Sequence, residues 1–205
     1  MAVWTQVVLC LLALQMGPMP SLAEAQPPEA ARLEAAEEVI ISGSLAVGQF
    51  SYTISGKTVL AAGKVESFEL LIRSGQSQVA AARTQPKIKG GTLLEYGGET
   101  RRLSTDCSPS LARLLSLTSR DLHGSMMVAR LPGQDTRTWE STSPFSVRPG
   151  LPVKVRFVFC KEPLGQDGGG NHLVEVTVWS LSEWNNSFDE NVVLRLRFSR
   201  GGCHD

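Results

Sequence analysis

The stretch VVLRLRF, residues 192–198, alternates apolar with basic side chains and so decides the fold class. Successive side chains of a β-strand point to opposite faces of the sheet. One face of this stretch is apolar, with Val192, Leu194, Leu196 and Phe198. Arg195 and Arg197 fall on the other face together with Val193. A strand with one apolar and one mixed face is typical of a sheet that separates a core from water.

Two preceding stretches show the same period, VKVRFVF at residues 153–159 and LVEVTVWSL at residues 173–181. The inward face is expected to hold Val153, Val155, Phe157 and Phe159 in the first stretch and Val174, Val176 and Val178 in the second. We expect the three strands to form an antiparallel up-down-up meander. Their mixed faces would then gather one cluster of side chains: Lys154, Arg156, Arg195 and Arg197 around Glu175, with Trp179 alongside.

The rest of the chain from residue 39 onward repeats this alternation, interrupted about every eight to twelve residues by Gly, Pro, Asn or Asp. This rhythm predicts an all-β fold, an antiparallel β-sandwich of two sheets. Turns are predicted at sequences such as SGKT (residues 55–58) and RSGQ (residues 73–76). The expected strands are 39–47, 49–55, 58–62, 65–73, 77–83, 92–96, 100–104, 125–131, 137–142, 152–159, 173–181 and 191–198.

One segment, near residues 108–118, predicts a short α-helix instead of a strand. Ser108 can cap the helix, and Pro109 suits the first helical position, where its missing N–H is not needed. Three leucines then share one helix face at i, i+3 and i+4 spacing: Leu111, Leu114 and Leu115. We expect this helix to plug one end of the sandwich.

The N-terminal residues 1–25 predict a cleavable signal peptide, with an apolar run, helix-breaking Gly17 and Pro18, and a small-x-small site before Gln26. The apolar run is shorter than the roughly 20 residues that a membrane-spanning helix needs. Residues 26–38 are expected to be a mobile arm, and residues 39–205 a single domain. The chain is therefore expected outside the cell or in the lumen of the endoplasmic reticulum, with no transmembrane segment after cleavage.

Removal of the signal peptide leaves Cys107, Cys160 and Cys203 in an oxidising compartment. We expect a Cys160–Cys203 disulfide, which would pin the last strand so that its edge does not fray. Cys107 would then remain as a free or intermolecular thiol. The alternative is a Cys107–Cys160 bridge, which would leave Cys203 for a disulfide-linked dimer.

Asn185 begins the sequon Asn185-Asn186-Ser187, in a turn expected between two strands. An exposed sequon of a secretory protein predicts N-glycosylation at Asn185.

The basic cluster formed by Lys154, Arg156, Arg195 and Arg197 has two interpretations. In the first, it is a binding patch for a sulfated glycan, an anionic lipid headgroup or an acidic protein surface, with Trp179 as a flat anchor. Alternatively, the cluster is a solvated sheet face on which cross-strand ion pairs keep the protein soluble. The second interpretation is the more common outcome for charges on an exposed sheet.

Several classes of function are not predicted. The chain has 20 basic and 20 acidic residues, so charge gives no support for nucleic-acid binding. Its histidines have no HExxH spacing and its serines no GxSxG motif, so no catalytic residue is assigned. A zinc set of Cys160, His172, Cys203 and His204 matches no common spacing, so neither metal nor cofactor is expected.

These observations predict a secreted or cell-surface β-sandwich binding module without catalytic activity, with a protein or a sulfated glycan as its partner. An alternative is a lumenal subunit of a membrane-bound complex, or a folding factor, of the endoplasmic reticulum. A third option is a carrier of apolar ligands, which would need an open cavity between the sheets.

Overall fold

The structure is a computed structural model that describes residues 36–47, 49–84, 91–103, 107–119, 121–123, 128–130, 137–142, 145–148, 151–160, 171–184 and 187–200. These residues form antiparallel strands and one helix, α2 (Ser108–Leu115), so the all-β class with one short helix is confirmed. The strands are β1 (Glu37–Val47), β2 (Phe50–Ala61), β3 (Lys64–Ser74), β4 (Ser77–Thr84), β5 (Thr92–Tyr96), β6 (Glu99–Leu103), β7 (Val128–Arg130), β8 (Thr138–Ser141), β9 (Phe145–Arg148), β10 (Leu151–Phe159), β11 (Leu173–Trp184) and β12 (Ser187–Ser199). The predicted signal peptide lies outside the described residues.

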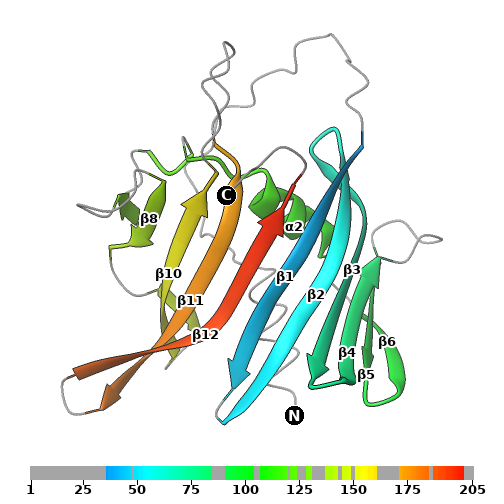
Figure 1. The fold of residues 1–205 in the computed structure, drawn as a ribbon, viewed down its shortest axis with the longest axis horizontal. Coiled ribbons are helices and arrows are strands. Elements are labelled where there is room, and N and C mark those ends of the chain that lie inside the picture. The colour runs from blue at the N-terminus through cyan, green and yellow to red at the C-terminus, as the bar shows by residue number, and fades with distance from the viewer. Residues whose placement is uncertain are drawn as a thin grey trace.

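The strands lie in one open sheet, in the order β6-β5-β4-β3-β2-β1-β12-β11-β10-β8-β7, with β9 paired to β10 (Figure 1). The expected two-sheet sandwich is therefore not confirmed. The reason is the pairing of β1 with β12, which runs from Ile40 opposite Ser199 to Leu45 opposite Leu194 and joins the two halves. Strand rhythm alone does not reveal which strands become neighbours.

The last strand, β12, lies in the interior of the sheet and not at its edge. It pairs with β11 on one side, as the meander predicts, and with β1 on the other. The meander β10-β11-β12 is thus confirmed. The expectation that a terminal disulfide protects a fraying edge was wrong, because β12 has a hydrogen-bonded partner on both sides.

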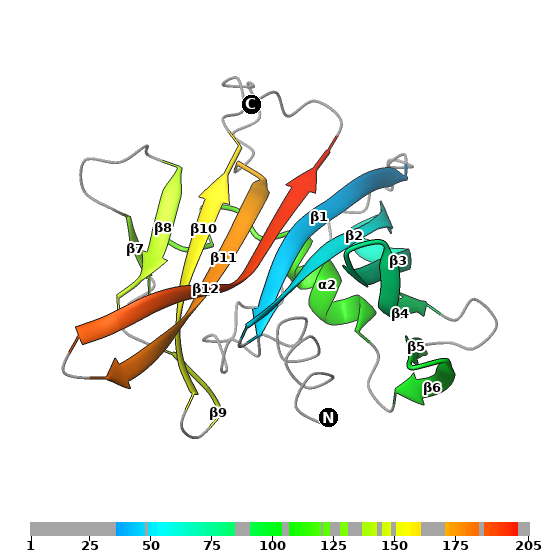
Figure 2. The same ribbon diagram turned by 60° about the horizontal axis from the view of Figure 1, so that its bottom comes forward.

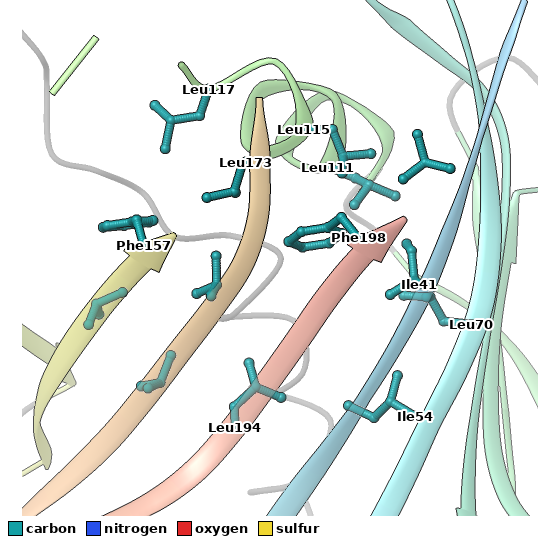
Figure 3. Close-up of a cluster of buried hydrophobic side chains, with 14 of the residues drawn as sticks. Ile41, Ile54, Leu70, Leu111, Leu115, Leu117, Phe157, Leu173, Leu194 and Phe198 are labelled. Carbon is teal, nitrogen blue, oxygen red and sulfur yellow. The ribbon is translucent and has the colours of Figure 1, made fainter. Parts of the chain in front are cut away.

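Helix α2 covers one face of the sheet, the inner face, where the core lies (Figures 2 and 3). Its buried Leu111 and Leu115 pack with Phe198 of β12 and Leu70 of β3. The helix therefore packs against the core side chains on the inner face of the sheet, and it does not plug the end of a sandwich. Cys107, not Ser108, occupies the N-cap position.

The core draws side chains from both halves of the sheet. Its buried members include Val39, Ile41 and Leu45 of β1, Ile54 of β2, Phe68 of β3, Val153, Val155, Phe157 and Phe159 of β10, Val176 and Val178 of β11, and Leu194 of β12. The inward residues predicted for β10 and most of those predicted for β12 are thus confirmed. Burying one such side chain contributes roughly 1.5–3 kcal/mol.

Strand β11 contains one β-bulge against β10, and β12 contains another against β11, where Val193 is the extra residue. At the bulge in β11, Phe159 lies opposite Leu173 while Val158 lies opposite Glu175, so Val174 is the extra residue. An extra residue changes the face to which the following side chains point. Leu173 is consequently buried beside Val176, whereas Val174, which was expected to face inward, is only half-buried.

The turn predicted at SGKT is wrong, because Gly56 lies in the middle of β2. A Cβ at this position would collide with the backbone carbonyl oxygen of Glu69 on β3. The glycine therefore permits close strand approach instead of a turn. The turn predicted at RSGQ is confirmed, with Gly75 at a positive φ of 58° between β3 and β4.

Two further boundaries differ from expectation. β1 begins at Glu37, so Glu37 and Glu38 belong to the sheet and not to the predicted arm, whose other residues apart from Ala36 lie outside the described ranges. β9 was not expected. It pairs with the beginning of β10 and lies next to it at the lower end of the sheet in Figure 2.

Arg200, directly after β12, links α2 to the sheet through its side chain. Its buried guanidinium donates a hydrogen bond from Nη2 to the carbonyl of Leu115, in the last turn of the helix, where carbonyls lack helical partners. Its Nη1 lies 3.3 Å from Oε2 of Glu37 at the start of β1. Burial lowers the pKa of Arg200, and the negative charge of Glu37 opposes that shift.

Candidate binding face

The face of the sheet turned away from α2, called the outer face below, brings the predicted basic cluster together. Arg156 of β10 lies opposite Thr177 of β11, which in turn lies opposite Arg195 of β12. Arg197 lies opposite Glu175, two residues further along the strands. Directly opposed residues in a sheet share a face. The four basic residues predicted from the sequence therefore share one surface, with Glu175 among the arginines.

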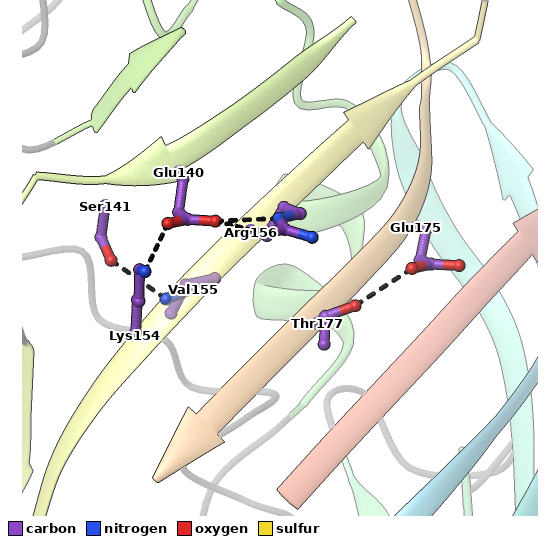
Figure 4. Close-up of polar contacts among 7 residues, drawn as sticks. All are labelled: Glu140, Ser141, Lys154, Val155, Arg156, Glu175 and Thr177. Carbon is purple, nitrogen blue, oxygen red and sulfur yellow. Dashed lines mark hydrogen bonds and ion pairs between the residues drawn. The ribbon is translucent and has the colours of Figure 1, made fainter. Parts of the chain in front are cut away.

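A second carboxylate, Glu140 of β8, holds two of these four cations (Figure 4). Its Oε1 lies 2.6 Å from Nζ of Lys154, and its Oε2 accepts hydrogen bonds from Nε and Nη2 of Arg156 at 2.9 and 2.6 Å. The side chain of Glu140 is only 8% exposed, whereas those of Lys154 and Arg156 are 27% and 33% exposed. Glu140 is thus a nearly buried anion beneath two half-buried cations.

Burial by itself would raise the pKa of Glu140. The hydrogen bonds and positive charges of Lys154 and Arg156 outweigh burial and hold the pKa below its usual value. The carboxylate is therefore ionised at neutral pH. Next to it, the hydroxyl of Ser141 accepts a hydrogen bond from the backbone N–H of Val155 at 3.1 Å, which fixes β8 against β10.

The guanidinium of Arg156 lies over the indole ring of Trp179. The guanidinium carbon of Arg156 lies 4.8 Å from the centre of the indole, a cation–π contact. Although Trp179 belongs to the predicted cluster, it is only 7% exposed. It therefore does not offer the flat, accessible anchor expected from the sequence, and instead holds Arg156 in place.

Glu175 organises the other two cations. Its Oε2 accepts a hydrogen bond from Nε of Arg197 at 2.9 Å, and its Oε1 lies 3.6 Å from Nε of Arg195. The hydroxyl of Thr177 donates to the same Oε1 at 3.0 Å (Figure 4). Arg195 and Arg197 are 44% and 63% exposed, the most accessible of the four. The cluster therefore has a supported half around Glu140 and an accessible half around Glu175.

Two residues of this face were not assigned to it from the sequence. Glu140 lies in the expected strand 137–142, but nothing in the sequence showed that this strand would pair with β10. Arg73 of β3 is exposed and lies in the same cross-strand row as Arg195, through Thr53 and Ser44. Only the pairing of β1 with β12 brings Arg73 to this surface.

The expected Cys160–Cys203 bridge lies partly outside the described residues. Cys107 and Cys160 are both buried, and Cys203 lies outside the described residues, as does Asn185. Burial of Cys107 disfavours an intermolecular bond there. Phe159 pairs with Leu173 at the start of β11, and Arg197 pairs with Glu175 nearby, so β10 and β12 end at the same edge of the sheet. The disulfide stays a prediction.

Other sites considered in the sequence find no further support. Within the described ranges, no group of three or more His, Cys, Asp or Glu side chains is placed to share a metal ion. No helix in that part of the chain is long and apolar enough to cross a bilayer. Neither a protein-family model nor a curated protein matches this chain.

Proposed function

We propose that this chain is a non-catalytic binding module of the secretory pathway that contacts its partner through the outer face of β10, β11 and β12. The observation that carries the proposal is the pair Arg195 and Arg197, exposed side chains that share the carboxylate of Glu175. The predicted signal peptide supports the compartment. A set of cations held by carboxylates suits recognition of an anion.

The position of this pair in the fold supports a binding role. β12 is hydrogen-bonded on both sides, and its inward Leu194 and Phe198 are buried in the core. The backbone beneath both arginines is therefore fixed before any partner arrives. A fixed surface loses less conformational entropy on binding than a mobile loop does.

A second candidate, a lumenal subunit of a membrane-bound complex, is favoured by the two ends of the open sheet. Among the described residues, β6 pairs only with β5 and β7 only with β8. The outer sides of such strands can pair with a strand of another chain. The third option, an apolar-ligand carrier, gains no support, because side chains of α2 and the sheet pack against one another across the inner face.

The two candidates are separated by expressing the full chain in secreting cells and measuring where it is found. The binding module should appear in the medium, with a further fraction held at the cell surface and released by high salt. Arg195→Glu combined with Arg197→Glu should abolish that surface fraction. A chain that is absent from the medium and recovered only in an intracellular membrane-bound complex would favour the lumenal subunit.

A matched control reverses the same amount of charge elsewhere. Arg101→Glu combined with Arg102→Glu places the change on the exposed edge strand β6 and should leave surface retention unchanged. Equal retention of the wild type and the Arg195, Arg197 variant would reject the outer face as the binding surface.

A further inference from the structure

The two accessible arginines use only part of their hydrogen-bonding capacity. Within the described residues, Arg195 and Arg197 both make their closest approach to Glu175 through Nε. No hydrogen bond within the described residues runs through Nη1 or Nη2 of either guanidinium. Arg156 differs, because it contacts Glu140 through both Nε and Nη2. Arg195 and Arg197 therefore each retain a forked pair of Nη donors.

Two such forks, set at fixed spacing, suit oxyanions with several oxygens. Residues i and i+2 of a strand are separated by roughly 7 Å, so the two forks lie side by side on the same face. A planar guanidinium can contact two oxygens of one anionic group at once, a geometry that a lysine ammonium does not provide. The site thus favours neighbouring sulfate, phosphate or carboxylate groups over a single small ion.

The surroundings of the forks are hydroxylated. On β1, Ser44 lies opposite Arg195 and Ser42 opposite Arg197, and both serines are exposed. On β2, Thr53 and Ser55 continue the same two rows. Hydroxyls can donate and accept hydrogen bonds, as sugar hydroxyls do. This part of the face is therefore chemically suited to a polyhydroxylated ligand.

The same surroundings disfavour a membrane or a typical protein interface. Ile40 is the one large apolar side chain that is exposed on the described part of this face of β1 and β12. The centre of a protein–protein interface is usually rich in aromatic and other apolar side chains, and binding at a membrane surface also buries apolar area. Trp179, the aromatic residue of the cluster, is covered by Arg156.

Charge extends beyond the two forks along the rows of the sheet. Arg73 lies three strands from Arg195 in one row, a separation of roughly 14 Å at a strand spacing of about 4.8 Å. Arg73, Arg195 and Arg197 with Lys154 and Arg156 make five positive charges, and Glu140 and Glu175 make two negative charges, so these seven residues together carry a net charge of +3. A linear polyanion laid across the strands would meet several of these cations.

We infer that the partner of the outer face is a sulfated glycosaminoglycan chain, whose sulfate groups contact the Nη edges of Arg195 and Arg197. The neighbouring serine and threonine hydroxyls of β1 and β2 contact the sugar rings. This inference rests on the proposed function and names the partner of the same surface.

Binding to heparin tests the contact with purified full chain. Arg195→Gln combined with Arg197→Gln should weaken binding at least about tenfold, since each lost charge-assisted hydrogen bond contributes on the order of 1.4 kcal/mol or more. Arg101→Gln combined with Arg102→Gln removes the same charge from β6 and should leave the affinity unchanged. An equal loss in both variants would show a response to net charge alone and would overturn the inference.

The forked geometry has a separate test that keeps the charge. Arg195→Lys combined with Arg197→Lys should elute from heparin at lower salt than the wild type, with the same thermal unfolding midpoint. Elution together with the wild type would overturn the guanidinium contact.

Digestion of the cell surface with heparinase and chondroitinase separates this inference from the proposed function. The salt-releasable surface fraction of the wild type should disappear after digestion. If the fraction survives digestion but is lost in the Arg195→Glu, Arg197→Glu variant, the glycan is the wrong partner and the outer face remains the binding surface. If it survives in that variant as well, both proposals fail.

Discussion

Replacing Glu140 by Gln tests whether the supported half of the outer face contributes to stability. The substitution keeps the shape of the side chain and removes the charge that holds Lys154 and Arg156. Removing one partner of a fully buried ion pair costs roughly 3–5 kcal/mol, and removing one from an exposed pair costs about 0–1 kcal/mol. The carboxylate here is nearly buried while its cations are about one-third exposed, so we expect a loss of about 2 kcal/mol in unfolding free energy.

Urea unfolding at pH 7 measures this loss, and an unchanged dependence on urea concentration would show that the unfolded state is not altered. The matched control is Glu95→Gln, which removes the carboxylate paired with Arg83 at side-chain exposures of 30% and 47%. This control should cost less than about 1 kcal/mol. A loss for Glu140→Gln no larger than the loss for Glu95→Gln would refute the reasoning.

The stability contributed by Glu140 should also depend on pH in a defined direction. Its pKa is lowered in the folded state, so the unfolded chain takes up a proton first as the pH falls. The contribution is complete above the ordinary glutamate pKa of about 4.3 and is lost as the pH falls through the lower folded pKa. The difference in unfolding free energy between wild type and Glu140→Gln should therefore shrink below about pH 4. A difference that stays constant down to pH 2 would contradict this assignment.

Three further predictions concern the fold and its processing. Gly56→Ala should lower the unfolding free energy by about 2 kcal/mol or more, because its Cβ would meet the backbone of β3, and an unchanged thermal midpoint would contradict this. Cys203→Ser should lower it by about 2–5 kcal/mol, Cys160→Ser should add nothing further, and peptide mapping without reductant should yield the Cys160–Cys203 pair. A dimer linked through Cys203 would show that the tail is an assembly contact. Treatment with an N-glycanase should reduce the mass of the secreted chain, and Asn185→Gln should abolish that shift.

Sequence periodicity predicted the local structure well because alternation is enforced residue by residue. The inward residues Val155, Phe157 and Leu194 are all buried as expected, and the boundaries of most strands agree within a few residues. The helix was found for a similar reason, since Leu111, Leu114 and Leu115 at i, i+3 and i+4 fit a helical period and not the alternation of a strand. Such patterns depend on residues that are close in the sequence, so they predict local secondary structure.

The arrangement of the strands was less predictable, because it depends on contacts between distant parts of the chain. Because β1 pairs with β12, the strands form one sheet and not the expected two-sheet sandwich. No local sequence pattern predicts this pairing. Gly56 was read as a turn because glycine favours both turns and close backbone approach. The bulge at Val174 places Leu173 on the inward face, and the sequence pattern did not predict this bulge either.

The candidate site was predicted in part. The basic residues of β10 and β12 follow from alternation, and the meander places them on one face. Glu140 could not be found, because it reaches the cluster only through the pairing of β8 with β10. For the same reason, the sequence did not show that Lys154 and Arg156 belong to a supported half while Arg195 and Arg197 remain accessible.

The affinity of the chain for a size-defined heparin oligosaccharide, measured at several salt concentrations, tests the central claim most directly. Binding to a linear polyanion releases counterions, so the logarithm of affinity falls with the logarithm of salt concentration in proportion to the number of charges neutralised. Wild type should bind with a steep salt dependence, and Arg195→Gln with Arg197→Gln should bind at least about tenfold more weakly, with a slope reduced by roughly two. Equal affinity and equal slope for the two proteins would contradict the account.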